Sequence, residues 1–343
     1  MKDNQNRTMI GQRRTSLKRI AIAGASLAAM QTHPFSSAWA QNTASWTSKP
    51  IRLLVGYPPG GPVDLAARSF GATLEKVIGQ SVVIENKGGA SGMLAAQTIA
   101  QAPSDGSYLF FAASPTISIA PHLQKGNNFD PLNQLAPIAQ VVEYANVLMV
   151  NKDLPFKTVS DLVAFARANP DKLSFGSAGV GGSNHLSAEL LKKMTQTQMV
   201  HVPYKGGAPM LVDLMGGQIQ YAFDNLPSSI QHIRSGKVKA LAVTTAKRWP
   251  HAPEIPTMAE AGLAGYESSA WFGLLAPGNT PKFIVELLNK HVSAILKQPE
   301  VEKIYLEQGA MPVGNSPEDF GRFIGAEMQK WKTVVNDTGV KLD

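Results

Sequence analysis

The chain has 343 residues, of which 44% are hydrophobic and 17% charged, a composition typical of a globular protein large enough for two domains. It contains no cysteine, which excludes disulfides, thiolate nucleophiles, iron–sulfur clusters and cysteine-type zinc sites. The formal net charge is +7, and its meaning depends on where the basic residues lie.

The first forty residues have the pattern of an export signal. Basic residues between Arg13 and Arg19 precede an apolar run at 20–30, which is too short to span a membrane. Ala38-Trp39-Ala40 is a small-x-small cleavage pattern. The stretch 12–18 resembles a twin-arginine signal, although Ser16 stands where that pattern prefers an aromatic residue. We therefore expect cleavage near Ala40 and a periplasmic mature protein, with the export route left open.

Removing this segment changes the charge argument. Residues 1–40 hold six of the 32 basic residues and one of the 25 acidic residues, so 26 basic and 24 acidic residues remain, a net of +2. Nucleic-acid binding needs a basic face, and no cluster of Lys or Arg follows residue 40. We expect no nucleic-acid partner.

A buried strand at 51–55 is followed by a glycine-rich turn and by a helix that begins at Pro62, where the fixed φ of proline suits a first helical position. Gly60 and Gly61 allow a sharp turn and the close approach of a ligand. The free N–H groups of the first helical turn then form an anion site at a strand end. Asp64 favours the helix dipole there, and it could equally hold a water or a ligand amine.

Short apolar runs alternate with helical patterns over the rest of the chain. Strands are predicted at 82–85, 108–112, 147–150, 173–176, 199–202, 221–224 and 239–244. Helices are predicted at 92–100, 160–168 with Ser160 as cap, 184–194, 208–215 and 228–235, and mostly helix from Pro281 onward. This alternation predicts an α/β fold with largely parallel sheets. About ten strands indicate two lobes with a cleft between them, joined by crossovers at 141–148 and 267–275.

A second glycine-rich turn at 174–185 also follows a strand and opens a helix, with Ser183 or Asn184 as the expected N-cap. One interpretation is simple helix capping or a dinucleotide-loop look-alike, because G-x-G spacing is common. The other is a second anion site, on a different lobe from the first. Two such sites facing each other would hold a dicarboxylate, or one carboxylate and a polar tail.

Several side chains near these turns have two interpretations. His185 and Glu189 have metal-ligand spacing, but partner ligands are missing nearby, so we expect His185 to orient the loop through a hydrogen bond. Asp224 ends a strand, where it either faces a ligand or caps the next turn. Tyr204 and Lys205 follow another strand and could reach the cleft, although a solvated lysine is the commoner outcome.

Catalytic signatures are missing from the sequence. It contains no G-x-S-x-G elbow, no H-E-x-x-H motif and no P-loop, and no spacing joins its Ser, His and Asp residues into a triad. We therefore expect no enzymatic activity.

Taken together, seven segments resemble the substrate-binding proteins of tripartite tricarboxylate transporters, often called Bug receptors. They run through essentially all of the chain beyond the export signal and lie at 57–68, 83–90, 103–106, 176–186, 201–206, 255–262 and 271–274. The resemblance implies the type II periplasmic binding protein architecture, in which two α/β lobes hinged by crossover strands enclose a ligand cleft. The implied division is 41–145 and 271–343 for the first lobe and 146–270 for the second.

The resemblance also implies which residues bind a small carboxylate. The first turn would grip a carboxylate, partly through ordered waters, with Tyr57, Pro59, Gly60, Gly61 and Asp64, completed by Ser114 and Thr116. The other end of the ligand would be held by Ser177, Gly179, Gly181, Ser183, Asn184 and His185, with Tyr204, Lys205 and Asp224 nearby. Lys205 stands where the family usually has Arg, and lysine lacks the bidentate fork that suits a carboxylate. Residues 182–184 vary within the family, so we expect ligand choice to be encoded there.

We therefore expect a non-enzymatic, monomeric receptor that captures a small organic carboxylate and delivers it to a tripartite-type membrane transporter or to a sensor, with no metal and no cofactor. An alternative is an exported α/β hydrolase that acts on a small carboxyl-containing substrate. A second alternative is a cofactor-carrying protein exported by the twin-arginine route, against which the lack of cysteine and of clustered ligands argues. The identity of the solute and the existence of a cognate transporter stay open.

Overall fold

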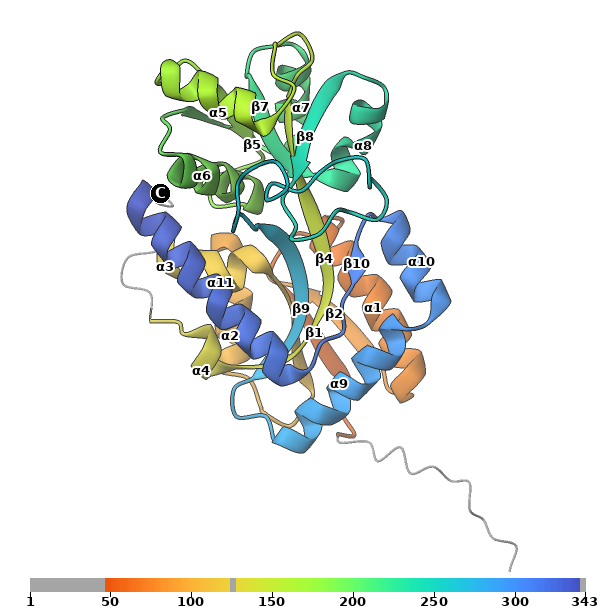
Figure 1. Ribbon diagram of the computed structural model, residues 1–343. Coiled ribbons are helices and arrows are strands. Elements are labelled where there is room, and N and C mark those ends of the chain that lie inside the picture. The colour runs from red at the N-terminus through yellow and green to blue at the C-terminus, as the bar shows by residue number, and fades with distance from the viewer. Residues whose placement is uncertain (1–46, 124–127, 340–343) are drawn as a thin grey trace, which may run out of the picture. The chain divides into compact units, whose positions relative to one another are not determined.

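The computed structural model describes residues 47–123 and 128–339 (Figure 1). The predicted export signal and its cleavage site near Ala40 lie outside these residues. Within the described ranges, no helix combines the length and the apolarity that crossing a bilayer requires.

The first part of the chain alternates strands and helices as predicted. Its elements are β1 (Ile51–Val55), α1 (Pro62–Ile78), β2 (Val82–Asn86), the short 3-10 turn η1 (Ala90–Gly92), α2 (Met93–Ala100), β3 (Tyr108–Ala113), the π-helical turn η2 (Pro115–Ile119), α3 (Ala120–Leu123), α4 (Pro131–Gln134) and the long β4 (Leu135–Asn151).

The middle part repeats this alternation, and the end is mostly helical, also as predicted. The middle elements are α5 (Val159–Ala168), β5 (Ser174–Ser177), α6 (Ser183–Thr195), β6 (Val200–Pro203), α7 (Gly207–Met215), β7 (Tyr221–Asn225), α8 (Leu226–Arg234) and β8 (Val238–Val243). The last elements are β9 (Ser269–Pro277), α9 (Lys282–Leu296), α10 (Pro299–Glu307), β10 (Met311–Pro312) and α11 (Pro317–Thr338).

The strands form one mixed sheet in the order β2-β1-β3-β9-β4-β7-β5-β6, and both β8 and β10 pair with β4. The two outer sets, β2-β1-β3 and β7-β5-β6, are parallel as predicted. The prediction of largely parallel sheets is wrong for the centre, where every pairing of β4 and β9 is antiparallel. The predicted crossover segments are themselves these long strands, which connect the two parallel sets (Figure 1).

The register of β4 shows how the two parallel sets are oriented. β3 runs in the same direction as β4, because both are antiparallel to β9, and it ends at Ala113, level with Val142 through Phe272. β7 runs against β4 and ends at Asn225, opposite Asn146. The carboxyl ends of the two sets therefore point toward each other across residues 143–145 of β4. We call the ends of β1, β2 and β3 with their loops the first edge, and the ends of β5, β6 and β7 with theirs the second edge.

Helices α1 and α6 cover the same face of β4. Tyr144 packs in one hydrophobic cluster with α1 residues such as Phe70, and Leu148 packs in another with α6 residues such as Leu186. Side chains alternate along a strand, so Tyr144 and Leu148 share a face, and Asn146 between them shares it too. The N-termini of α1 and α6 consequently open on the same side of the gap between the edges.

Helix α11 packs on both halves of the molecule. Its first turns place Phe320 and Ile324 in the cluster around Trp271 on the side of the first edge. Its last turns place Trp331 and Val334 in the cluster beneath α6. Figure 1 shows the helix running from one parallel set to the other beside α6. Besides β4 and β9, it is a third connection between the two sets.

Two predicted helix caps are wrong. Helix α5 is capped by Thr158, whose hydroxyl accepts the N–H of Asp161 while the Asp161 carboxylate accepts the N–H of Thr158, so the predicted cap Ser160 lies inside the helix. Helix α6 has Gly182 as its N-cap, and the predicted caps Ser183 and Asn184 belong to its first turn. In both cases the helix begins a residue or more before the expected side chain.

Candidate functional site

The first edge is organised by the buried carboxylate of Asp64. Its Oδ2 accepts hydrogen bonds from Gly60 N and Arg68 Nε, both at 2.9 Å, and its Oδ1 accepts one from Asn86 Nδ2 at 2.8 Å. Burial alone would raise the pKa of Asp64, but the hydrogen bonds from Arg68, Gly60 and Asn86 outweigh it and hold the pKa below its usual value. Asp64 thus ties the turn after β1 to the end of β2.

The glycines of this turn have different roles. Gly60 has a φ of +82°, a left-handed conformation that favours glycine, whereas Gly61 has a φ of −78°, which any residue adopts. A Cβ on Gly60 would meet nothing within 4 Å, and one on Gly61 would meet only Pro58 O, at 3.5 Å. Space is therefore open above both positions. Leu65 N makes its bond to Gly61 O, so the N–H groups of the preceding helical turn point out of the end of α1.

Tyr57 and Thr116 meet at a loop that the sequence did not assign to the site. The hydroxyl of Tyr57 lies 3.1 Å from Thr116 Oγ1, and both hydroxyls bond to the carbonyl oxygen of Ser91, at 3.4 Å and 2.7 Å. A Cβ on Gly92 would lie 2.4 Å from Thr116 Oγ1, so this loop must approach closely. Its run of glycines at 88, 89 and 92, directly after a strand, is the signal that could have found it.

Ser114 and Pro59 complete the first edge. Ser114 is buried, and its Oγ accepts the N–H of Trp271 at 3.4 Å, which links the end of β3 to β9. Pro59 is exposed in the turn after β1. The structure therefore brings the predicted residues of the first turn, Ser114 and Thr116 to one edge of the sheet.

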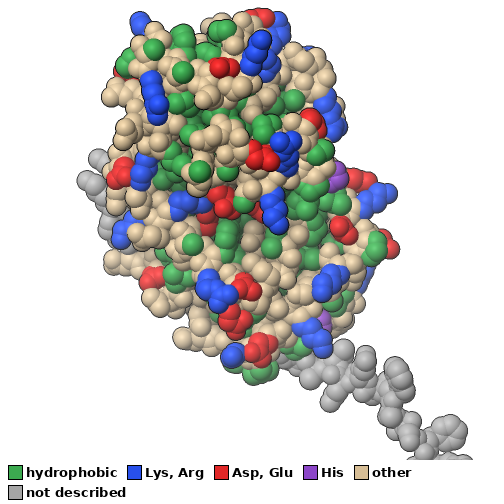
Figure 2. All heavy atoms as spheres, viewed as in Figure 1, with side chains coloured by type: hydrophobic (Ala, Val, Ile, Leu, Met, Phe, Trp, Pro, Cys, Tyr) green, Lys and Arg blue, Asp and Glu red, His purple; other side chains and the backbone are tan. Residues whose placement is uncertain are grey.

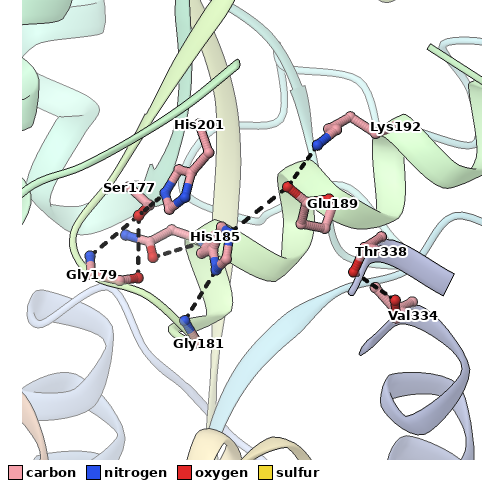
Figure 3. A network of polar contacts seen from close by, with 10 residues as sticks. Ser177, Gly179, Gly181, His185, Glu189, Lys192, His201, Val334 and Thr338 are labelled. Atoms are coloured by element: carbon pink, nitrogen blue, oxygen red, sulfur yellow. Dashed lines mark hydrogen bonds and ion pairs between the residues drawn. The ribbon is translucent and has the colours of Figure 1, made fainter. Parts of the chain in front are cut away.

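The second edge is organised by two stacked histidines (Figure 3). His185 Nδ1 accepts the N–H of Gly181 at 3.0 Å, which confirms the prediction that His185 orients the loop. Ser177 Oγ lies 2.7 Å from His201 Nε2 and 3.2 Å from the carbonyl oxygen of Gly179. The two imidazole rings stack with centroids 3.9 Å apart. His201, which the sequence did not single out, thus holds the other half of the same loop.

Both histidines are neutral at pH 7. Burial, repulsion from His201 and the charge of Lys192 lower the pKa of His185 to about 3, and burial with Lys192 lowers the pKa of His201 to about 4. Because His185 Nδ1 accepts a hydrogen bond, the ring proton is on Nε2, which faces Glu189 Oε1 at 3.8 Å. Glu189 pairs with Lys192 at 2.9 Å. Among the residues that the structure describes, no group of three or more His, Cys, Asp or Glu side chains is placed to hold a metal.

The side chains of Tyr204 and Asn184 make hydrogen bonds within the protein, whereas the side chain of Lys205 is exposed. The hydroxyl of Tyr204 donates to Asp213 Oδ2 at 2.7 Å, and burial together with this bond raises the pKa of Tyr204 to about 12. The hydroxyl is therefore directed at α7. Lys205 is exposed. Asn184 is buried, and its Oδ1 accepts the N–H of His185 at 2.9 Å, whereas Ser183 is partly exposed in the first turn of α6.

Asp224 lies on the face of β7 that packs against α7 and α8, opposite to the face that α6 covers. Its Oδ2 accepts the hydroxyl of Ser229 at 2.8 Å, and its carboxylate also accepts the N–H of Asn225. Of its two interpretations, the structure supports the cap of the turn into α8. A Cβ on Gly207 would lie 3.3 Å from Asp224 Oδ1, so the carboxylate also lies over the start of α7. Burial raises the pKa of Asp224 to about 6.

Charge on the surface does not gather into a basic patch in the view of Figure 2. Lys and Arg side chains are spread over that face and are interspersed with Asp and Glu. Several basic side chains form ion pairs, among them Arg248 with Glu260 and Lys49 with Asp105, both at 2.8 Å.

Comparison with known proteins gives one consistent family. Residues 66–340 match the model of the tripartite tricarboxylate transporter family receptor. The chain is 35% identical to Protein BugT of Bordetella pertussis over 299 residues, which cover 87% of this chain and 92% of BugT.

Solved structures agree with this similarity. An R. palustris protein solved with adipate is 39% identical, with a TM-score of 0.73 over 86% of this chain and 99% of the other. MatC from Rhodopseudomonas palustris, solved with bound malate, is 33% identical, with a TM-score of 0.69 over 83% of this chain and 98% of the other. The similarities confirm the predicted fold class, the two-lobed α/β architecture of periplasmic binding proteins.

Proposed function

We propose that this chain, which belongs to the tripartite tricarboxylate transporter family of receptors, is a periplasmic receptor that captures a small organic carboxylate between its two edges and delivers it to a membrane transporter. The single observation that carries the proposal is the pair of facing edges. Each edge presents the N-terminus of a helix, α1 or α6, on the same side of β4. Helix N-termini favour negatively charged groups.

Of the residues named from the sequence, we propose for the ligand those around the two helix N-termini, and not Tyr204 or Asp224, whose side chains bond elsewhere. On the first edge, Gly60 and Gly61 leave open space above the N-terminus of α1, which supports the close approach of a carboxylate and its waters. On the second edge, Ser177, His185 and His201 fix a loop whose turn leads into α6. Relatives solved with adipate and with malate support a carboxylate as the ligand class.

The proposed lobes are 41–145 with 271–343, and 146–270. These limits fall where β4 changes its partner from β9 to β7, between Ala145 and Asn146, and near the start of β9. A hinge of two long strands allows the edges to approach a bound ligand. Solved relatives described as a periplasmic transporter and as the periplasmic binding protein BugD support a periplasmic location.

A hydrolase is the second candidate, because Ser177 Oγ and His201 Nε2 are 2.7 Å apart, as a nucleophile and its base would be. Ser177, however, is fully buried, and its hydroxyl also bonds to the Gly179 carbonyl. The low pKa of His201, about 4, makes it a weak base. These observations favour a structural role for the pair. Turnover of a p-nitrophenyl ester that Ser177→Ala abolishes would revive the hydrolase.

Calorimetry on the mature protein tests the proposed function. The titrants are C4 to C6 mono- and dicarboxylates, adipate and malate included, each with its amide analogue. We expect saturable 1:1 binding of at least one acid and a loss of tenfold or more for its amide, because charge-assisted hydrogen bonds are each worth roughly 1.5–3 kcal/mol. Equal affinity for acid and amide, or no binding of any acid, would contradict the proposal.

A further inference from the structure

Two buried amide oxygens at the second edge have no hydrogen-bond partner among the described residues, namely Asn146 Oδ1 and Asn225 Oδ1. The two residues are paired directly between β4 and β7, so their side chains leave the same face with Cβ atoms about 5 Å apart. Asn146 is fully buried, and Asn225 is partly exposed and therefore borders the gap between the edges. Buried polar groups are normally satisfied, so two adjacent free acceptors indicate that a donor belongs there.

The hydroxyls that bond around Asn146 do not supply that donor, and that of Thr244 donates to the carbonyl oxygen of Asn146. Ser187 Oγ donates to the carbonyl oxygen of Ser183 at 2.7 Å and accepts Asn146 Nδ2 at 3.3 Å. Ser268 Oγ lies 2.8 Å from Ser187 Oγ, whose own proton is already donated, so the Ser268 hydroxyl is the donor between them. The hydroxyl protons of this cluster are therefore used within it.

The N-terminus of α6, which is linked to Asn146 through Ser187, carries backbone donors. The first intrahelical bond of α6 runs from Leu186 N to Gly182 O at 3.0 Å, and His185 N donates to Asn184 Oδ1 at 2.9 Å. The N–H groups of Ser183 and Asn184 come before these bonds and point out of the helix end. Ser183 and Ser187 connect this turn to Asn146. The second edge thus combines an anion-binding helix end with two neutral acceptors.

We propose that Asn146 and Asn225 bind the hydroxyl group of a 2-hydroxycarboxylate whose carboxylate lies at the N-terminus of α6. This inference rests on the proposed function and names its ligand class. A hydroxyl has one proton, which a three-centre hydrogen bond shares between the two amide oxygens. Its lone pairs can at the same time accept a backbone N–H. An ammonium group suits the position less, because Asp224 faces the opposite side of β7 and leaves two uncharged oxygens to balance a buried charge.

The direct test compares matched acids that differ by one hydroxyl, malate against succinate and 2-hydroxyadipate against adipate, by calorimetry on the mature protein. We expect the hydroxy acid of the better-binding pair to bind at least tenfold more tightly, because a site built around a hydroxyl rejects the analogue that lacks it. Equal affinity within a pair that binds would overturn the inference and leave the proposed function intact. Binding of none of the four acids or of the wider carboxylate panel would overturn both.

Two variants test whether the amides of Asn146 and Asn225 cause the preference for the hydroxy acid. Asn225→Leu keeps the size of the side chain and removes its acceptor, so the hydroxyl preference should fall to less than threefold while the deoxy acid binds as before. Asn146→Leu should do the same, and Asn225→Leu carries the test if Asn146→Leu fails to fold. Asn151→Leu is the matched control, because Asn151 is also buried on β4 but bonds to Leu214 O at the far end of the strand.

The control separates a ligand role from the loss of a buried asparagine. Asn151→Leu should lower the melting temperature and leave the hydroxyl preference unchanged. If the preference for the hydroxy acid survives in Asn225→Leu, or falls equally in Asn151→Leu, the two amides do not recognise the hydroxyl of the ligand. An ordered water as the only occupant of the two acceptors would give this result.

Discussion

At the scale of single residues, the turn after β1 separates two functions of glycine that sequence alone cannot distinguish. Gly60 needs its left-handed φ of +82°, whereas Gly61 has an ordinary φ and open space above it. The sequence Pro-Gly-Gly-Pro predicts a turn that both glycines permit. Only the backbone geometry shows that the turn requires glycine at position 60 and that the φ of Gly61 does not require it.

The first prediction uses this difference. Gly61→Val should lower carboxylate affinity at least tenfold, since the branched side chain enters the space above α1, while the melting temperature of the empty protein falls only slightly. Gly60→Ala is the matched variant, and it should reduce stability by about 1 kcal/mol because alanine is strained at that φ. Calorimetry and thermal unfolding measure both effects. Near-normal affinity in Gly61→Val would remove this turn from the binding site.

The buried carboxylate of Asp224 makes a second prediction, about pH. Burial raises its pKa from 3.8 to about 6, so the folded protein holds this proton more tightly than the unfolded chain does. Its contribution to stability is greatest below pH 3.8 and is lost as the pH rises toward 6. Asp224→Asn stays neutral at every pH. Its unfolding free energy minus that of the original protein should therefore be about 2–3 kcal/mol larger at pH 7.5 than at pH 4.

Urea unfolding at the two pH values gives the difference directly. The asparagine keeps an acceptor for Ser229 and for the backbone of Asn225, so the comparison removes the charge and little else. A gain that is the same at pH 4 and pH 7.5 would mean that ionisation of Asp224 does not affect stability.

At the scale of elements, the sequence predicts the strands and helices well because each buried strand is a short apolar run and most turns carry glycine or proline. The central strands are the exception. β4 and β9 were expected as crossovers between lobes, but their antiparallel pairing depends on which distant strands lie beside them. The loop at 88–92 was visible as a glycine-rich turn, and its contact with Thr116 was not.

The candidate site divides in the same way. Residues next to glycine-rich turns, such as Gly61 and His185, could be named from local pattern. Asn146 and Asn225 could not, because they are 79 positions apart and become neighbours only through the β4–β7 register. His201 was missed for a similar reason, since its partner Ser177 lies on the adjacent strand.

The cap of α5 supplies a third prediction. Thr158 and Asp161 form reciprocal hydrogen bonds, so Thr158→Ala should cost about 1 kcal/mol of stability. Ser160→Ala is the matched control on the same helix. It removes an exposed hydroxyl inside the first turn and should change stability by less than about 0.5 kcal/mol. Chemical denaturation measures both, and a larger loss in Ser160→Ala would contradict the cap assignment.

At the scale of the whole molecule, the facing edges predict a closing motion. If a ligand bridges the two edges, the lobes should approach each other about the β4–β9 hinge. Small-angle scattering of the mature protein should then show a smaller radius of gyration with saturating ligand than without. The carboxylate that binds in calorimetry is the ligand to use, and a non-binding acid is the control. An unchanged radius at saturation would argue against closure.

Helix α11 sets a condition on any such motion. Phe320 and Ile324 hold its beginning to the first-edge side, and Trp331 and Val334 hold its end beneath α6, where Lys193 also pairs with Asp337 at 2.6 Å. If the lobes rotate relative to each other, this continuous helix must bend, slide or release one of its anchors. The last helix would then register whether the receptor is loaded, at a surface far in sequence from every residue that touches the solute. A transporter could then distinguish loaded from empty receptors by binding to the surface of α11 alone.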